Sequence, residues 1–268
     1  MSNLMNRRNF VKTSAAAAVL AGAKNSFGTA DDTNAKKQEY YEFRIYQTED
    51  SNKMKKVDRY LQKALLPALG RMGINRLGVF TNMDKADDYS IYVLIPYTIL
   101  DMFAAVNPKL LADKEYMGAA KDYFGASKDD PVFTRIKSKF CKAFSGMPVI
   151  EMPAQSVDNK PRLFELRIYE SYTEEKAALK VDMFNSGEIQ VMRDTGLAPV
   201  FYGETLIGDD IPNLTYMLSA SDREAHEAHW KNFREHPQWE MMKNLAKYKD
   251  TVSKITNIFL KPTIYSQI

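Results

Sequence analysis

The sequence predicts an α+β protein made of two tandem ferredoxin-like units, each with the element order βαββαβ. The segment at 42–46, Glu-Phe-Arg-Ile-Tyr, recurs at 165–169 as Glu-Leu-Arg-Ile-Tyr. The glycine that ends the following helical stretch recurs at the same spacing of 123 positions, as Gly73 and Gly196. Because chance similarity would not keep register through both a strand and a helix, the repeat indicates duplication of a folding unit.

Alternating and helical patterns place the elements of the first unit. Alternation of apolar and polar residues predicts strands at 40–47, 75–82, 89–95 and 137–144. Apolar residues at helical spacing between 57 and 69 predict a helix that ends at Gly73. A second helical stretch covers 99–124, and we expect Pro108 to break it and to begin a new helix.

The second unit repeats this order. Its expected strands are 162–170, 198–206, 212–219 and 253–261, and its first helix is 174–194. Ser221 and Glu224 form a capping box that predicts the start of its second helix. Each sheet has one face packed on helices and needs a cover for the other face, so the two sheets are expected to face each other as a barrel.

The first 30 residues have the composition of an export signal. They carry four basic residues and no acidic residue, followed by an Ala-rich stretch. The segment 7–12, Arg-Arg-Asn-Phe-Val-Lys, fits the twin-arginine pattern. A basic arm or a membrane anchor is the alternative, but the apolar run is shorter than the roughly 20 residues that a span needs. We therefore expect export by the twin-arginine route and a periplasmic or secreted mature protein without stable membrane insertion.

The resulting domain organisation has five parts. Residues 1–30 are the export signal, 31–39 a linker, 40–150 the first unit, 151–161 a second linker and 162–268 the second unit.

Net charge gives no support to nucleic-acid binding. The chain has 37 basic and 34 acidic side chains, and removal of residues 1–30 leaves 33 basic and 34 acidic side chains. The mature protein is thus nearly neutral, and we expect no nucleic-acid partner.

The single cysteine, Cys141, excludes an intrachain disulfide. It lies in an apolar alternation typical of a strand, so a buried small side chain is favoured over a reactive thiol.

The C-terminal half resembles the NIPSNAP family. The residues that carry the resemblance are Arg223, Trp230, Pro237 and Trp239, together with the closing segment 259–266, Phe-Leu-Lys-Pro-Thr-Ile-Tyr-Ser. The resemblance covers 163–268 well and 40–150 more loosely. It implies dimeric α/β-barrel domains, the superfamily of small cofactor-free monooxygenases and haem-binding proteins, and it implies no agreed enzymatic activity.

The three histidines lie within eleven residues and raise the question of a metal or haem site. On one continuous helix His226, His229 and His236 would share a face. Pro237 disfavours a helical conformation at His236 and is expected to begin a new helix. We therefore predict no metal ligation and no cofactor, and interpret these residues as an exposed polar helix face with His236 as a cap.

The repeated strand faces supply the candidate ligand-binding residues. These are Glu42, Arg44 and Tyr46 in the first unit, and Glu165, Arg167 and Tyr169 in the second. On the barrel model they would point into the interior, where a carboxylate, a guanidinium and a phenol could bind a small acidic or phenolic ligand. Salt-bridged sheet residues are the structural alternative.

Two hypotheses of function follow from these residues. The first is a ligand-binding or scaffold protein with a small-molecule partner, which could also form a homodimer. The second is a cofactor-independent oxygenase or isomerase of a small aromatic or quinone-like substrate. No phosphate-binding loop or nucleophile elbow is present to name another reaction.

Overall fold

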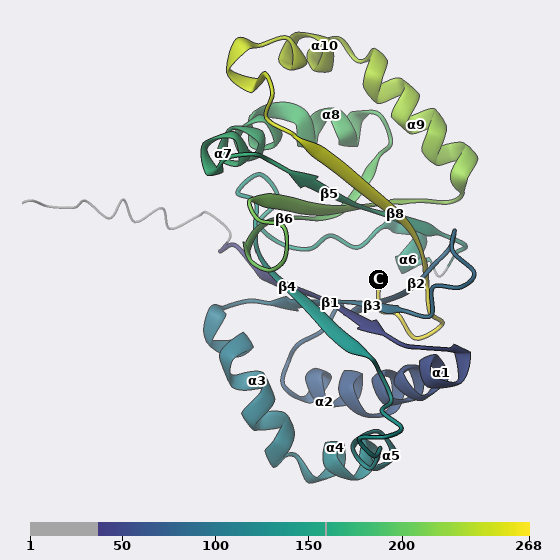
Figure 1. Ribbon diagram of the computed structural model, residues 1–268. Helices are drawn as coiled ribbons and strands as arrows, with labels where there is room; N and C mark the ends of the chain where they lie inside the picture. The colour runs from purple at the N-terminus through teal and green to yellow at the C-terminus, as the bar shows by residue number, and fades with distance from the viewer. Residues whose placement is uncertain (1–36, 159) are drawn as a thin grey trace, which may run out of the picture. The chain divides into compact units, whose positions relative to one another are not determined.

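Eight antiparallel strands close into a barrel in the computed structural model, which describes residues 37–158 and 160–268 (Figure 1). The strands are β1 (Tyr40–Gln47), β2 (Gly78–Asn82), β3 (Ile91–Tyr97), β4 (Arg135–Ala143), β5 (Leu163–Glu170), β6 (Ala198–Ile207), β7 (Asn213–Ala220) and β8 (Lys254–Pro262). Their order around the barrel is β1-β3-β2-β8-β5-β7-β6-β4, so each half of the chain contributes four adjacent strands. The barrel therefore closes within one chain.

Helices cover the two halves of the barrel on opposite sides (Figure 1). One side carries α1 (Ser51–Tyr60), η1 (Leu61–Leu65), α2 (Leu66–Arg71), α3 (Leu100–Ala112), α4 (Lys114–Ala119) and α5 (Lys121–Phe124). The other carries α7 (Glu174–Met183), η2 (Phe184–Glu188), α8 (Ile189–Asp194), α9 (Arg223–Glu235) and α10 (Pro237–Lys243). Short helices α6 (Ala154–Val157) and η3 (Ala246–Tyr248) lie in connections.

Every predicted strand overlaps an observed one, and the predicted barrel of mixed helices and strands is confirmed. The predicted signal at 1–30 lies outside the described residues, as does most of the first linker. The described residues belong to one compact unit.

The barrel interior is apolar, and this corrects the predicted direction of the repeated polar residues. Alternate residues such as Phe43 on β1 and Leu166 on β5 pack inward with Cys141, which is buried as expected. An eight-stranded barrel is wide enough for its own side chains to fill it, or for one small ligand. The side chains of 42, 44 and 46, and those of 165, 167 and 169, consequently point outward beneath the helices, so their predicted place in the interior is wrong.

Two details of the predicted helices are also wrong. Pro108 lies inside α3, and the break comes later at Asp113, whose carboxylate accepts hydrogen bonds from the first amides of α4. At the start of α9 the cap is Asp222 and not Ser221, because the Asp222 carboxylate accepts from the amide of Ala225. Ser221 instead donates to Asp222. The aspartate is the stronger acceptor, which moves the cap by one residue.

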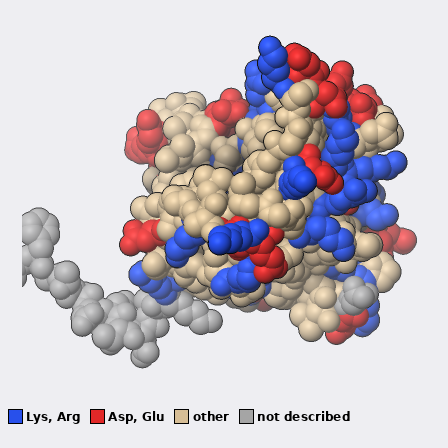
Figure 2. All heavy atoms as spheres, turned by 90° about the horizontal axis from the view of Figure 1, so that it is seen from below, with Lys and Arg blue, Asp and Glu red and all other residues tan. Residues whose placement is uncertain are grey.

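The helix-covered face of the first half carries charges of both signs (Figure 2). Lys55, Lys56 and Arg59 of α1 and Lys121 of α5 line one groove of this half, with Asp122 among them. The groove itself is basic, whereas the mixture of both charges over the whole face is typical of a solvated surface. Within the described residues no helix is both long and apolar enough to cross a membrane.

Packing inside the barrel makes a direct prediction for Gly203 of β6. A Cβ at this position would lie 2.7 Å from Cys141 Cβ. We expect Gly203→Ala to lower the free energy of unfolding by about 1–3 kcal/mol, as overpacking does. Gly118→Ala, where a Cβ meets no atom within 4 Å, should leave stability unchanged or raise it by up to about 1 kcal/mol. Urea denaturation measures both, and equal stability of the two variants would contradict a tightly packed interior.

Candidate functional site

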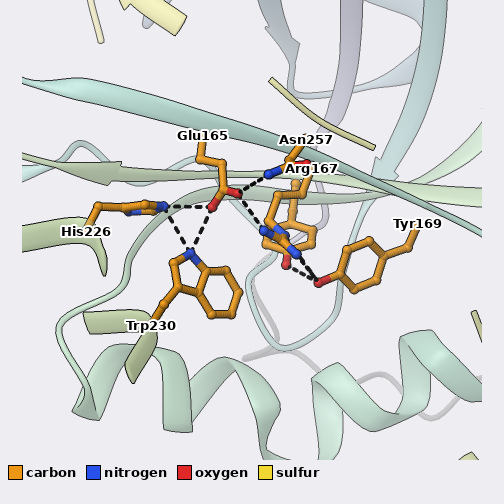
Figure 3. Close-up of polar contacts among 7 residues, drawn as sticks. Glu165, Arg167, Tyr169, His226, Trp230 and Asn257 are labelled. Atoms are coloured by element: carbon orange, nitrogen blue, oxygen red, sulfur yellow. Dashed lines mark hydrogen bonds and ion pairs between the residues drawn. The ribbon is translucent and has the colours of Figure 1, made fainter. Parts of the chain in front are cut away.

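A buried carboxylate, Glu165 on β5, collects four hydrogen-bond donors in the second half (Figure 3). Oε2 accepts from His226 Nε2 at 2.8 Å and from Trp230 Nε1 at 2.9 Å. Oε1 accepts from Arg167 Nη1 at 2.5 Å and from Asn257 Nδ2 at 3.2 Å. The site therefore draws its side chains from β5, β8 and α9.

Local structure explains this convergence. Strand alternation sends 165, 167 and 169 to the same side of β5, and the β5–β8 register places Asn257 directly beside Arg167. His226 and Trp230 are four residues apart on α9, so they share the helix face that packs on this sheet.

The donors keep Glu165 ionised. Burial alone would raise its pKa, but the hydrogen bond to His226 and the charge of Arg167 lower the pKa to about 2. An ionised carboxylate only accepts hydrogen bonds, so Nε2 of His226 must carry a proton. A protonated Nε2 cannot accept from the indole, and Trp230 therefore donates to Glu165. Glu165 is thus a poor proton acceptor, and it positions the groups around it.

Arg167 connects Glu165 to two tyrosines. Its Nε and Nη2 donate to the Tyr169 hydroxyl at 3.2 and 3.1 Å, and its guanidinium lies 4.6 Å from the centre of a Trp230 ring. The Tyr216 hydroxyl donates to Tyr169 at 2.8 Å. Among the described residues nothing accepts the proton of Tyr169, and burial raises the pKa of this phenol. Tyr169 therefore holds a proton that it can donate to a ligand.

A second buried pair lies beside this network. Lys180 Nζ of α7 is 2.7 Å from Glu188 Oε2 of η2, and both side chains are about 95% buried or more. The ammonium also lies 4.6 Å from the ring centre of Phe184 and 5.5 Å from that of Trp239. Burial raises the pKa of Glu188, and the charge of Lys180 opposes this shift only in part. A carboxyl group with a raised pKa is a candidate proton acceptor at neutral pH.

These groups open into a cleft of about 670 Å³ between the sheet and the helices. Its apolar wall includes Phe233, Trp239, Val252, Ile255 and Phe259. Both tryptophans of the chain line it. A largely apolar wall with a few convergent polar groups is the usual composition of a small-molecule site.

The first half repeats the central contacts. Glu42 accepts from Arg44 Nε at 2.5 Å and from Arg44 Nη2 at 2.9 Å. Ser138 Oγ and the Tyr97 hydroxyl complete its shell at 2.8 and 2.9 Å. Tyr46 is buried among apolar side chains of the helices.

The surroundings of the two copies differ. The positions 123 residues before Lys180, Glu188 and His226 hold Val57, Leu65 and Phe103. All three first-half residues are apolar, and the Phe103 ring lies 4.2 Å from that of Phe140. The structure thus keeps the two predicted sets apart, on opposite sides of the barrel, and only the second opens into the cleft.

The predicted family-signature residues have distinct places. Trp230 and Trp239 line the cleft. Arg223 forms an ion pair with Asp84 of the first half and lies 4.0 Å from the Phe259 ring centre. Pro237 is the first residue of α10, as expected.

The histidines do not form the predicted exposed face. His226 is buried against Glu165, because an ionised carboxylate inside the protein requires donors. The cap is confirmed, since His236 Nδ1 accepts from the amide of Gln238 at 3.3 Å. In residues 37–158 and 160–268 no three His, Cys, Asp or Glu side chains cluster as metal ligands would.

Sequence reasoning missed His226, Asn257, Lys180 and Glu188 as site residues. A signal was present for three of them. Lys180, Glu188 and His226 are polar where the first copy is apolar, at the spacing of the repeat. Asn257 gave no such signal, because Ser138 is polar as well.

Fold and cleft together describe an α/β-barrel protein with a cleft lined by polar and aromatic groups in its second half. Residues 164–267 match the NIPSNAP family model. No curated protein matches the chain.

Solved structures share the fold. A protein from Lactobacillus acidophilus NCFM, named as a candidate monooxygenase, has a TM-score of 0.57 at 12% identity over 84% of this chain and 94% of its own. A second candidate monooxygenase, from Fusobacterium nucleatum, has a TM-score of 0.53 at 9% identity over 84% and 93%. An anthrone oxidase-like protein has a TM-score of 0.50 at 10% identity over 85% and 93%. At these identities the likeness is one of fold.

The pKa of Glu165 predicts how stability depends on pH. Because the pKa is depressed from 4.5 to about 2, its contribution is present above pH 4.5 and is lost as pH falls towards 2. The difference in unfolding free energy between the parent protein and Glu165→Gln should shrink by roughly 3 kcal/mol between pH 5 and pH 2. The exposed Glu224→Gln is the control, with a difference that stays within about 0.5 kcal/mol. A pH-independent difference for Glu165→Gln would show that the carboxylate is not stabilised as described.

Proposed function

We propose that the second-half cleft binds a small planar aromatic compound that carries a phenolic or carbonyl oxygen. The observation that carries this proposal is the contrast between the two copies. In the first half, Tyr46 is buried in an apolar cluster, whereas Glu165, Arg167 and Tyr169 of the second half all line a cleft together with both tryptophans.

The side chains that line the cleft indicate how such a ligand would bind. Aromatic rings pack well against Trp230, Trp239 and Phe259. The free proton of Tyr169 supplies a hydrogen bond to an oxygen of the ligand, and Arg167 supports that phenol from behind. Glu165 holds Arg167 in place and does not itself contact the ligand oxygen.

Intrinsic fluorescence tests this binding, because the only two tryptophans line the cleft. Anthrone and 1-naphthol should quench the emission saturably. Tyr169→Phe removes one neutral hydrogen bond and should weaken binding about tenfold. Tyr46→Phe, the same change in the first half, should leave the Kd within about twofold. Absence of quenching, or equal weakening in both variants, would refute the assignment.

Oxidation without a cofactor is the second candidate function. Glu188 lines the cleft with a raised pKa and could remove a proton from an acidic carbon, while Lys180 and Tyr169 stabilise the oxyanion formed. With anthrone as substrate, one oxygen atom of O2 would convert the ring CH2 to C=O, and the other would leave as water with the two hydrogens. The substrate supplies the electrons, so no reductant is required. The names of the monooxygenase-like and anthrone oxidase-like fold neighbours support this candidate.

Oxygen uptake distinguishes catalysis from binding alone. If the enzyme hypothesis holds, Glu188→Gln should lower the rate of anthrone-dependent O2 consumption at least about 100-fold, the lower range for a general base. Glu227→Gln, at the exposed edge of the cleft, should retain the rate within about twofold. Saturable quenching without O2 uptake would eliminate oxidation and leave the binding proposal intact.

We further propose that the two halves are duplicated ferredoxin-like units of a NIPSNAP-family protein. Support comes from the family match to 164–267 and from the same order of strands in each half. A homodimer of the whole chain remains a proposal, and light scattering at micromolar concentration would decide between one chain and two.

Export by the twin-arginine route also remains a proposal, based on segment 7–12. Replacement of both arginines, Arg7→Lys with Arg8→Lys, should retain the protein in the cytoplasm of a bacterium that has this route. Unchanged extracytoplasmic accumulation in cell fractionation would rule the route out.

A further inference from the structure

A lysine points into the barrel at one end, where Asn213 and Thr215 form a polar group with it. On β4 the inward-facing row contains Ala143, Cys141 and Lys139, and the strand register sets Lys139 beside Phe43 of β1. Lys139 is half-buried, and even partial transfer of an ammonium out of water is costly without a charged partner. The contacts of this lysine therefore need an explanation.

Its ammonium has neutral partners only. Nζ donates to Asn213 Oδ1 at 3.0 Å and to Thr215 Oγ1 at 3.1 Å. No carboxylate oxygen of residues 37–158 or 160–268 lies within salt-bridge distance of it. Burial lowers the pKa of Lys139, and the nearby acidic residues offset this only in part. One of the three N–H groups has no protein acceptor in the described part of the chain.

The neutral partners are themselves fixed. Asn213 is 2% exposed, and its amide donates to the carbonyls of Asp209 and Asp210 at 3.1 and 2.8 Å. Thr205 Oγ1 donates to the same Asn213 oxygen at 2.7 Å. The loop at Gly208 lies so close to Lys139 that a Cβ there would approach it to 3.2 Å. Lys139 is held in one position by this arrangement.

A cavity of about 200 Å³ adjoins the lysine at the end of the barrel. Its apolar wall is formed by Phe43, Ile45, Leu166, Ile168 and Ile258, which come from β1, β5 and β8. This volume is below the usual 300–1,000 Å³ of drug-sized sites, so the cavity suits a small ligand.

The charges at the rim are largely compensated. Lys254 Nζ lies 2.7 Å from Glu170, and Lys137 Nζ lies 3.7 Å from Asp209. Asp210 is the remaining acid and is exposed, where solvent and salt screen it. Of the three lysines that line the cavity, Lys139 is the one with no carboxylate of the described residues within salt-bridge distance.

We propose that this cavity binds a small apolar monocarboxylate, whose carboxylate accepts the third N–H of Lys139 and whose apolar part lies between Phe43, Leu166 and Ile258. The carboxylate of the ligand would be the salt-bridge partner of the Lys139 ammonium. Hydrogen bonds between two charged groups are stronger than those between neutral groups. This site is separate from the tryptophan-lined cleft, since the barrel wall of β5 and β8 lies between them: inward residues of these strands line the one and outward residues the other.

Titration calorimetry with benzoate tests the proposal on the full chain, with benzamide as the neutral analogue. Benzoate should bind at least tenfold more tightly than benzamide, and Lys139→Met should abolish the difference. Lys137→Met, at the compensated rim, should leave the Kd within twofold. Arg167→Lys, in the other site, should leave it unchanged, so failure of the cleft proposal does not affect this result.

A second variant is needed as a control, because Lys139→Met also removes two hydrogen bonds and could destabilise the protein. Ile258→Trp keeps the lysine and fills the cavity, and it should eliminate benzoate binding. Equal affinity of the parent protein for benzoate and benzamide, a preference for benzoate that survives Lys139→Met, or benzoate binding that survives Ile258→Trp would overturn the proposal.

Discussion

Closure of eight strands into a barrel imposes one constraint on every other part of this protein. The interior of such a barrel holds little more than its own side chains, so one face of each strand must be apolar. The opposite face, beneath the helices, becomes the place where polar groups can gather. Glu165, Arg167 and Tyr169 follow this rule on β5, and the equivalent residues follow it on β1. The location of the candidate site is thus a consequence of strand number and alternation.

The two helix-covered faces show how a duplicated arrangement can diverge. Both retain an ionic pair between a strand glutamate and the arginine two residues later, held by a donor from the neighbouring strand. In the first half, Phe103 and Val57 hold the positions equivalent to His226 and Lys180 and belong to the apolar cluster around Tyr46. In the second half, His226 and Lys180 replace them and leave a cleft. The second copy thus differs from the first by polar side chains that line a cleft.

Much of the fold could be predicted from the sequence because its signals are local and periodic. Strand alternation around Phe43 and Leu166 and helical spacing near Leu61 located their elements within a few residues. The direction of each strand face could not be predicted in the same way. Tyr46 and Tyr169 alternate equally well with either face inward, and only closure of the barrel decides between them.

The site was partly predictable for the same reason. The repeat identified Glu165, Arg167 and Tyr169, but the partners of Glu165 come from distant segments. His226 approaches it from a helix 61 residues away and Asn257 from a strand 92 residues away. Such contacts depend on how α9 and β8 pack, which no local pattern contains. Pro108 was misplaced for a related reason, since tertiary packing tolerates it within α3.

The two seams of the barrel have a mechanical consequence. Within each half, neighbours such as β1 and β4 are paired over eight residues, whereas β2 and β8 pair over three and β4 and β6 over four with a register shift. The two seams together hold seven residue pairs, whereas β1 alone holds fifteen with β3 and β4. The protein thus consists of two four-stranded sheets joined along two short seams. If the sheets separate transiently at the seams, amide hydrogen exchange will be faster along the seams than within each sheet.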